Sequence, residues 1–263
     1  MSARPIGIFD SGVGGTSIWK EIQELLPQER TIYLADGKNA PYGEKTKETI
    51  LQLSIKNTEY LLQQNCKLIV VACNTATTNA IGYLRKTYDV PFIGIEPAIK
   101  PAALQSASKT IGVLATKGTL TSSLFHSTAK DHAKNSEIIE QQGKGLVALI
   151  ESGKLHTAET RELLQGYLKP MLEKGIDYLV LGCTHYPYLI PLLKEILPSG
   201  VTIIDSGEAV ARQTKAVLKR DGLLNTLDNG DGSHQFLTNT DVALLQHFVS
   251  EVAATKTVDY LDF

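Results

Sequence analysis

The sequence predicts an α/β fold of two pseudo-symmetric domains, each a mainly parallel sheet flanked by helices, with the active site in the cleft between them. Short β-branched runs alternate with amphipathic stretches along the chain, which is typical of parallel sheets covered by helices. The alternation occurs twice, because a single offset relates both Cys73 to Cys183 and Ile93 to Ile203. Two copies of so long a period indicate two similar domains rather than a solenoid.

The first half of the chain reads as strands that alternate with helices. Its strand segments are short and rich in Ile, Val, Leu and Phe, whereas its helical segments carry apolar residues at helical spacing. The expected strands cover residues 6–9, 31–34, 68–71 and 92–95, and the expected helices cover residues 17–26 and 45–64.

The second half repeats this order and is followed by a tail. Expected strands cover residues 110–114, 138–140, 178–181 and 202–204, followed by a helix at 208–220, a polar Gly-rich loop at 225–233 and a short strand at 235–237. Because the segment from Glu208 onward has no counterpart in the repeat, we expect it to return to the first sheet. The expected domains are residues 1–97 plus 208–263, and residues 98–207.

Composition and charge argue against several classes of protein. A formal net charge of -2 over 263 residues, without any Lys- or Arg-rich block, leaves no footprint for nucleic acid. No stretch approaches the roughly 20 apolar residues of a membrane span, and no signal-peptide pattern is present, so we expect a cytoplasmic protein without membrane contacts. The cysteine usage fits a reducing compartment. No Cys-x-x-Cys or His-x-x-x-His spacing indicates a metal.

A glycine-rich segment, Asp-Ser-Gly-Val-Gly-Gly-Thr-Ser at residues 10–17, follows the first expected strand and opens a helix. Free backbone N–H groups at such a turn can bind an anion. The glycine spacing does not fit the nucleotide-binding motifs, so the expected ligand is a small carboxylate. The alternative is a plain strand-to-helix turn that Asp10 caps.

A second turn, Pro41-Tyr42-Gly43, follows the second expected strand and approaches the same edge of the sheet. Its backbone could contact a ligand there. The alternative is that it is only a turn, as most Pro-x-Gly segments are.

Two cysteines occupy matching positions at the ends of expected strands. Cys73 precedes Asn74 and Thr75, and Cys183 precedes Thr184 and His185. A thiol ahead of a helix is stabilised as a thiolate by the helix N-terminus. A single cysteine at such a place is more often an inert buried residue, but the symmetric pair indicates a paired acid and base. Cys66, in contrast, is expected to be a packing residue without a catalytic role.

Three further residues could assist the thiols. His185 lies two residues after Cys183 and could share its proton, and Asp10 is the corresponding carboxylate near Cys73. Glu151 ends an apolar helical pattern before Gly153, where position alone indicates a solvated helix end.

These segments, in this order and over nearly the whole chain, resemble the glutamate racemase family of cofactor-independent amino-acid racemases, which supply D-glutamate for bacterial peptidoglycan. The matching segments are Asp10-Ser11-Gly12-Val13-Gly14-Gly15, Ala40-Pro41-Tyr42-Gly43, Ala72-Cys73-Asn74-Thr75-Ala76 and Gly182-Cys183-Thr184-His185-Tyr186-Pro187. The resemblance implies an isomerase of cell-wall biogenesis and cell shape that binds a small molecule and uses neither cofactor nor metal. Members commonly form homodimers, and the sequence leaves the oligomeric state of this chain open.

The resemblance also implies roles for individual residues. Cys73 and Cys183 are the catalytic acid/bases, Cys73 for D-glutamate and Cys183 for L-glutamate, with Asp10, Glu151 and His185 as auxiliary catalytic residues. The implied substrate-binding residues are Asp10, Ser11, Pro41, Tyr42, Gly43, Asn74, Thr75, Thr184 and His185. Inversion of the α-carbon then needs one thiolate and one thiol on opposite faces of the substrate, and the two ionisations are coupled.

Other functions remain open at this point. Aspartate racemases share part of the pattern and differ in substrate. An amino-acid-binding protein without catalysis could have the same cleft, although it has no need of matched cysteines. A thiol hydrolase would use one cysteine with a histidine, which leaves Cys73 unexplained.

Overall fold

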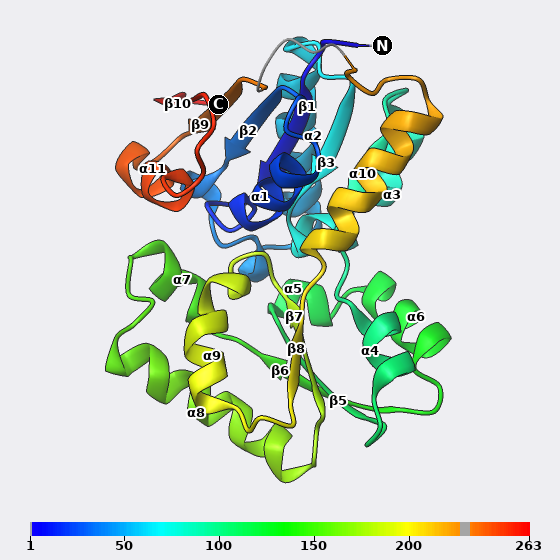
Figure 1. The fold of residues 1–263 in the computed structure, drawn as a ribbon, viewed down its shortest axis with the longest axis vertical. Helices are drawn as coiled ribbons and strands as arrows, with labels where there is room; N and C mark the ends of the chain where they lie inside the picture. The colour runs from blue at the N-terminus through cyan, green and yellow to red at the C-terminus, as the bar shows by residue number, and fades with distance from the viewer. Residues whose placement is uncertain (1, 227–231) are drawn as a thin grey trace.

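The computed structural model describes residues 2–226 and 232–263, which form two sheets stacked one above the other in Figure 1. The larger sheet has the strand order β10-β9-β2-β1-β3-β4, the smaller sheet has the order β6-β5-β7-β8, and all neighbours are parallel. The larger sheet consists of β1 (Ile6–Asp10), β2 (Thr31–Ala35), β3 (Leu68–Val71), β4 (Phe92–Gly94), β9 (His234–Thr238) and β10 (Lys256–Tyr260). The smaller sheet consists of β5 (Thr110–Ala115), β6 (Glu137–Gln142), β7 (Tyr178–Gly182) and β8 (Thr202–Ile204). The predicted fold class of two parallel sheets flanked by helices is confirmed.

Helices connect the strands and cover the sheets. The α-helices are α1 (Thr16–Leu25), α2 (Lys47–Gln63), α3 (Asn74–Thr87), α4 (Ile99–Gln105), α5 (Lys117–Leu120), α6 (Ser123–His132), α7 (Leu146–Glu151), α8 (Ala158–Glu173), α9 (Ile190–Ile196), α10 (Gly207–Arg220) and α11 (Val242–Val249). Short 3-10 turns are η1 (Gly37–Asn39), η2 (Tyr42–Glu44) and η3 (Tyr186–Leu189). No helix within residues 2–226 and 232–263 is long and apolar enough to cross a membrane.

The expected elements differ from the observed ones mainly at their ends. The long helix expected at 45–64 begins only at Lys47, because the Thr46 hydroxyl accepts a hydrogen bond from the Thr49 N–H and caps it. The strand expected at 92–95 ends at Gly94. The loop expected at 225–233 lies partly outside the described residues, and its described part forms no helix or strand.

The tail returns to the larger sheet, since β9 pairs with β2 and β10 pairs with β9. Helix α11 and strand β10 were not expected. The β10 segment is mostly polar and half exposed at the sheet edge, so no apolar run marks it. The division into residues 1–97 plus 208–263 and residues 98–207 stays a proposal.

The apolar face of α1 shows how the core positions the first strand. Ile18, Trp19 and Ile22 recur at helical spacing and are buried. The Trp19 ring packs edge-on against Phe236 of β9, with centroids 4.7 Å apart. The helix is thereby held over the larger sheet, with its N-terminus at the carboxyl end of β1.

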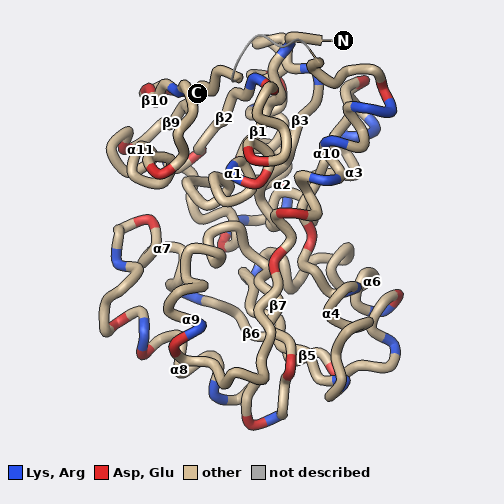
Figure 2. The backbone as a smooth tube through the Cα atoms, in the orientation of Figure 1, with Lys and Arg blue, Asp and Glu red and all other residues tan. Residues whose placement is uncertain are grey.

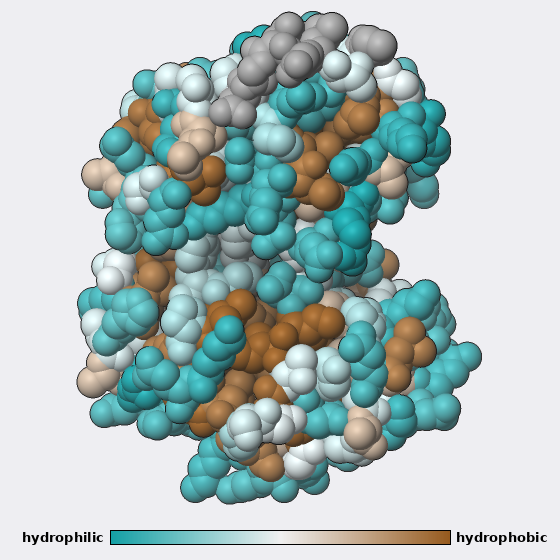
Figure 3. Space-filling model, viewed as in Figure 1, coloured by the Kyte–Doolittle hydropathy of each residue, from teal (hydrophilic) through white to brown (hydrophobic). Residues whose placement is uncertain are grey.

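Figure 3 shows the surface hollowed at the level where the two halves meet.

Candidate active site

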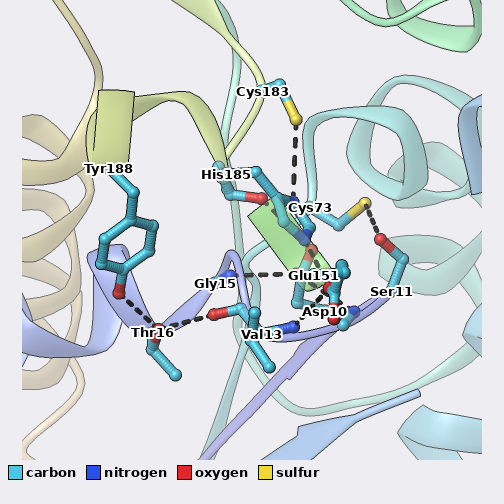
Figure 4. A network of polar contacts seen from close by, with 12 residues as sticks. Asp10, Ser11, Val13, Gly15, Thr16, Cys73, Glu151, Cys183, His185 and Tyr188 are labelled. Carbon is cyan, nitrogen blue, oxygen red and sulfur yellow. Dashed lines mark hydrogen bonds and ion pairs between the residues drawn. The ribbon is translucent and has the colours of Figure 1, made fainter. Parts of the chain in front are cut away.

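The carboxyl ends of three strands place the key side chains at the boundary between the two halves. Asp10 ends β1, Cys73 follows β3, and Cys183 follows β7. All three residues are buried. Ligands of parallel sheets bind at this edge, and Figure 4 shows the side chains of both sheets gathered there.

Cys73 caps the N-terminus of α3. Its Sγ accepts a hydrogen bond from the Ala76 N–H at 3.4 Å and lies 3.8 Å from the Ser11 hydroxyl. Burial raises the pKa of the Cys73 thiol well above its usual value, and the negative charges of Asp10 and Cys183 raise it further. The structure therefore favours the protonated form of Cys73.

Cys183 faces a histidine and a carboxylate instead. Its Sγ lies 3.8 Å from His185 Nδ1, and His185 Nε2 lies 2.6 Å from Glu151 Oε1. Burial lowers the pKa of His185, but the hydrogen bonds to Cys183 and Glu151 outweigh burial and raise it well above its usual value. A protonated His185 can donate a hydrogen bond to both partners.

Glu151 is not the solvated helix end that its position in the sequence indicates. Its side chain is only 20% exposed, and its Oε1 also accepts the Val13 N–H at 3.0 Å. Burial raises the pKa of Glu151, but the hydrogen bond and the charge of His185 lower it below its usual value. Glu151 thus carries the negative charge that holds His185 protonated.

The glycine-rich loop binds carboxylates that belong to the protein. The Gly12 and Gly15 N–H groups donate to Asp10 Oδ2 at 3.2 and 2.9 Å, and the Val13 N–H donates to Glu151. These three N–H groups are therefore occupied by carboxylates of the protein, and binding of a substrate carboxylate by the loop stays a prediction. Burial raises the pKa of Asp10, so Asp10 is suited to exchange a proton with Cys73.

The second turn meets the other half of the molecule at Gly43. A Cβ on Gly43 would lie 2.8 Å from the Thr116 Cβ, so the Thr116 side chain leaves no room for a side chain at position 43. The Tyr42 hydroxyl donates to Asp36 and its ring is buried. Pro41 and Gly43 line a small cavity together with Thr116.

Asn74 and Thr75 differ in their contacts. Asn74 is buried, yet neither polar atom of its side chain has a hydrogen-bond partner among the described residues. The Thr75 Oγ1 lies 2.8 Å from Thr116 Oγ1 and 3.5 Å from Thr119 Oγ1, which belong to the other half. The Thr184 hydroxyl donates to Asp10 Oδ1 at 3.3 Å.

Thr116 and Thr119 lie against Thr75 at the boundary of the two halves, and neither belongs to the motifs described above. The repeat contains a signal for Thr116, because the alignment of residues 6–12 with residues 111–117 pairs it with Ser11.

No group of three or more His, Cys, Asp or Glu side chains within the described residues has the arrangement of a metal site. Figure 2 shows acidic and basic residues interspersed along the chain.

The fold, with a buried cysteine at the end of one strand in each half, is that of a racemase. The chain belongs to the Asp/Glu/Hydantoin racemase family, whose sequence profile matches residues 6–214. A glutamate racemase of Ectopseudomonas mendocina is 50% identical to it over 227 residues, which cover 86% of each chain. The solved glutamate racemase of Bacillus anthracis matches with a TM-score of 0.88 at 31% identity and covers 100% of this chain and 99% of that chain. The glutamate racemase of Francisella tularensis, solved in complex with D-glutamate, matches with a TM-score of 0.84 at 28% identity and covers 98% of both chains.

Proposed function

We propose that this protein interconverts L- and D-glutamate by a proton transfer between two thiols at the α-carbon. The observation that carries the proposal is the pairing of each buried cysteine with its own proton partner. Cys73 interacts with Asp10, and Cys183 with the pair His185–Glu151. The relatives described above are glutamate racemases, which supports glutamate as the substrate.

The protonated thiol of Cys73 and the contact of Cys183 with His185 support a reaction that starts from L-glutamate as follows. The Cys183 thiolate removes the Cα proton, and the Cys73 thiol delivers its proton to the opposite face. The product is D-glutamate, with Cys183 now protonated and Cys73 a thiolate. The reverse reaction starts from this second state, so the two thiols titrate as a coupled pair.

Asp10 and His185 each assist one of the two thiols in proton transfer. Asp10 takes the proton of Cys73 when the thiolate is needed, and its raised pKa makes this transfer feasible. His185 balances the charge of the Cys183 thiolate, and Glu151 orients the ring from the far side. We propose these residues as auxiliary catalytic groups.

Substrate recognition is assigned to neutral groups around the thiols. Asn74 offers a donor and an acceptor that are both unpaired and buried, as a site for an amino acid requires. We propose that Ser11, Thr75, Thr184 and the backbone of the turn at residues 41–43 complete the site.

Proton transfer by positioned groups contributes about 10²- to 10⁴-fold, which is too little for so weak a carbon acid. The remainder must come from positioning and from a dry, preorganised environment. The burial of both cysteines supplies such an environment once substrate is enclosed.

Proton NMR in D₂O tests the function. Purified protein with L-glutamate, and separately with D-glutamate, is followed for loss of the Cα–H signal and for optical rotation, without added cofactor. Exchange with loss of rotation from both enantiomers supports racemisation. Glutamate binding without exchange would favour a binding protein, and exchange of aspartate alone would keep the mechanism but change the substrate.

The biological role follows from the product. We propose that the D-glutamate serves peptidoglycan synthesis, and thereby cell-wall biogenesis and cell shape, in the cytoplasm. Formation of a homodimer stays a prediction, which the molar mass in solution tests.

A further inference from the structure

A buried carboxylate that the reaction does not use lies beneath the second turn. Asp36 follows β2 and has no exposed surface. Its Oδ1 accepts hydrogen bonds from Asn39 Nδ2 at 2.9 Å and Asn239 Nδ2 at 2.6 Å. Its Oδ2 accepts the Tyr42 hydroxyl at 2.5 Å and lies 3.7 Å from Lys56 Nζ. A buried charge with this many partners is held in one position.

Tyr42 connects Asp36 to the site. The Tyr42 hydroxyl donates to Asp36 and accepts from Asn57 Nδ2 at 3.1 Å, so its hydrogen bonds are made within the protein. Burial and the negative charge of Asp36 raise the pKa of Tyr42 well above its usual value, which keeps the hydroxyl a donor. Only the backbone of the turn is left to face a ligand.

The position of this backbone must be precise. Gly43 has no room for a Cβ against Thr116, and a Cβ on Gly118 would lie 3.3 Å from the Gly43 Cα. The turn is therefore confined between Asp36 on one side and helix α5 of the other half. Loss of the hydrogen bond between Tyr42 and Asp36 would free the turn on the side of Asp36, whereas its contact with α5 would remain.

The tail of the chain takes part in this arrangement. Asn239, which follows β9, donates to Asp36 and accepts the Lys38 N–H at 2.9 Å. Lys56 also donates to the Phe263 carbonyl at 3.1 Å. Residues of the tail thus support the turn at 41–43 from behind, a contact that links the end of the described chain to the site.

We propose that Asp36 is a positioning residue for substrate binding, which acts through the Tyr42 hydroxyl to hold the backbone of residues 41–43 where glutamate is recognised. The inference rests on the proposed function, because it assigns substrate contacts to that turn. Asp36 touches neither thiol and takes no part in proton transfer.

A double-mutant cycle tests the connection between the two residues. Asp36→Asn, Tyr42→Phe and the double variant are compared in KM and kcat for L-glutamate. Tyr42→Phe removes the hydroxyl that donates to Asp36, and Asp36→Asn replaces the charged acceptor by a neutral amide; we expect each to raise KM about tenfold with kcat retained. The double variant is expected to match the single variants, since both interrupt the same contact.

Glu29→Gln serves as the matched control. Glu29 is also a buried carboxylate of the larger domain, paired with Lys67 Nζ at 2.6 Å. We expect this variant to lower the melting temperature without changing KM, which separates positioning from general loss of stability.

The outcomes separate the two proposals. Unchanged KM in both single variants, or effects that multiply to about a hundredfold in the double variant, would overturn the role of Asp36 while the racemase activity of the unmodified protein stands. An unmodified protein that binds glutamate without racemising it would overturn the proposed function instead, and the same cycle would then be read from the dissociation constant by calorimetry.

Discussion

Glu151 Oε1 lies 2.6 Å from His185 Nε2 and at the same time accepts the Val13 N–H. One oxygen of α7 thus connects the glycine-rich loop after β1 with the residue beside Cys183. The contact joins the two halves of the molecule, and together with the hydrogen bond to Cys183 it raises the pKa of His185.

The stability that this pair contributes depends on pH. The folded-state pKa of His185 is raised from 6.5, so its contribution is fully present below about 6.5 and is lost as pH rises through the folded value. The pKa of Glu151 is lowered from 4.5, so its contribution is present above about 4.5 and is lost as pH falls through the folded value. Glu151→Gln is therefore expected to lower the melting temperature most between pH 4.5 and 6.5. Thermal unfolding across pH measures this, and a difference independent of pH would contradict it.

Both active-site thiols are expected to be essential. Cys73→Ala and Cys183→Ala should each abolish racemisation, because each removes the acid/base on one face of the α-carbon. Cys66→Ala is the matched control: Cys66 is also buried, burial raises its pKa to about 12, and it lies away from the site. We expect that variant to remain active. Substantial turnover in either active-site variant, measured by circular dichroism, would refute the two-thiol mechanism.

Asn74 is expected to serve substrate binding and not the stability of the fold. Both polar atoms of its side chain lack partners while buried, so Asn74→Ala removes an unfavourable burial. The variant should have a raised KM for glutamate and an unchanged or higher melting temperature. Asn57→Ala provides the contrast, because Asn57 Nδ2 donates to the Tyr42 hydroxyl and its loss should destabilise the fold. A lower melting temperature in Asn74→Ala would make Asn74 structural.

Gly14 leaves room for the imidazole of His185. A Cβ at this position would overlap Nδ1 and two ring carbons of His185, so Gly14→Ala should displace the ring from Cys183 and lower kcat strongly. Gly82→Ala is the control, since no atom lies within 4 Å of a Cβ there and helix α3 should gain about 0.5–1 kcal/mol. Steady-state kinetics and thermal unfolding of both variants check this. Full activity of Gly14→Ala would show that the ring position is not critical.

Much of the site could be predicted because it is encoded locally. Cys73 and Cys183 each follow an apolar strand within a few residues, and the parallel fold brings strand ends to one edge. The repeat added that the two thiols belong to opposite halves. Glu151 is different: its neighbours in sequence indicate a solvated helix end, and only the approach of His185 from another element changes its environment.

The sequence by itself determined the alternation of strands and helices, the repeat and the identity of the two thiols, because these depend on residue spacing along the chain. The tertiary structure alone decided that the glycine-rich loop binds Asp10 and Glu151, and that Asp36 holds Tyr42 with help from Asn239. These contacts join residues far apart in sequence, and each arises only once packing has buried a charge that must find its hydrogen-bond partners.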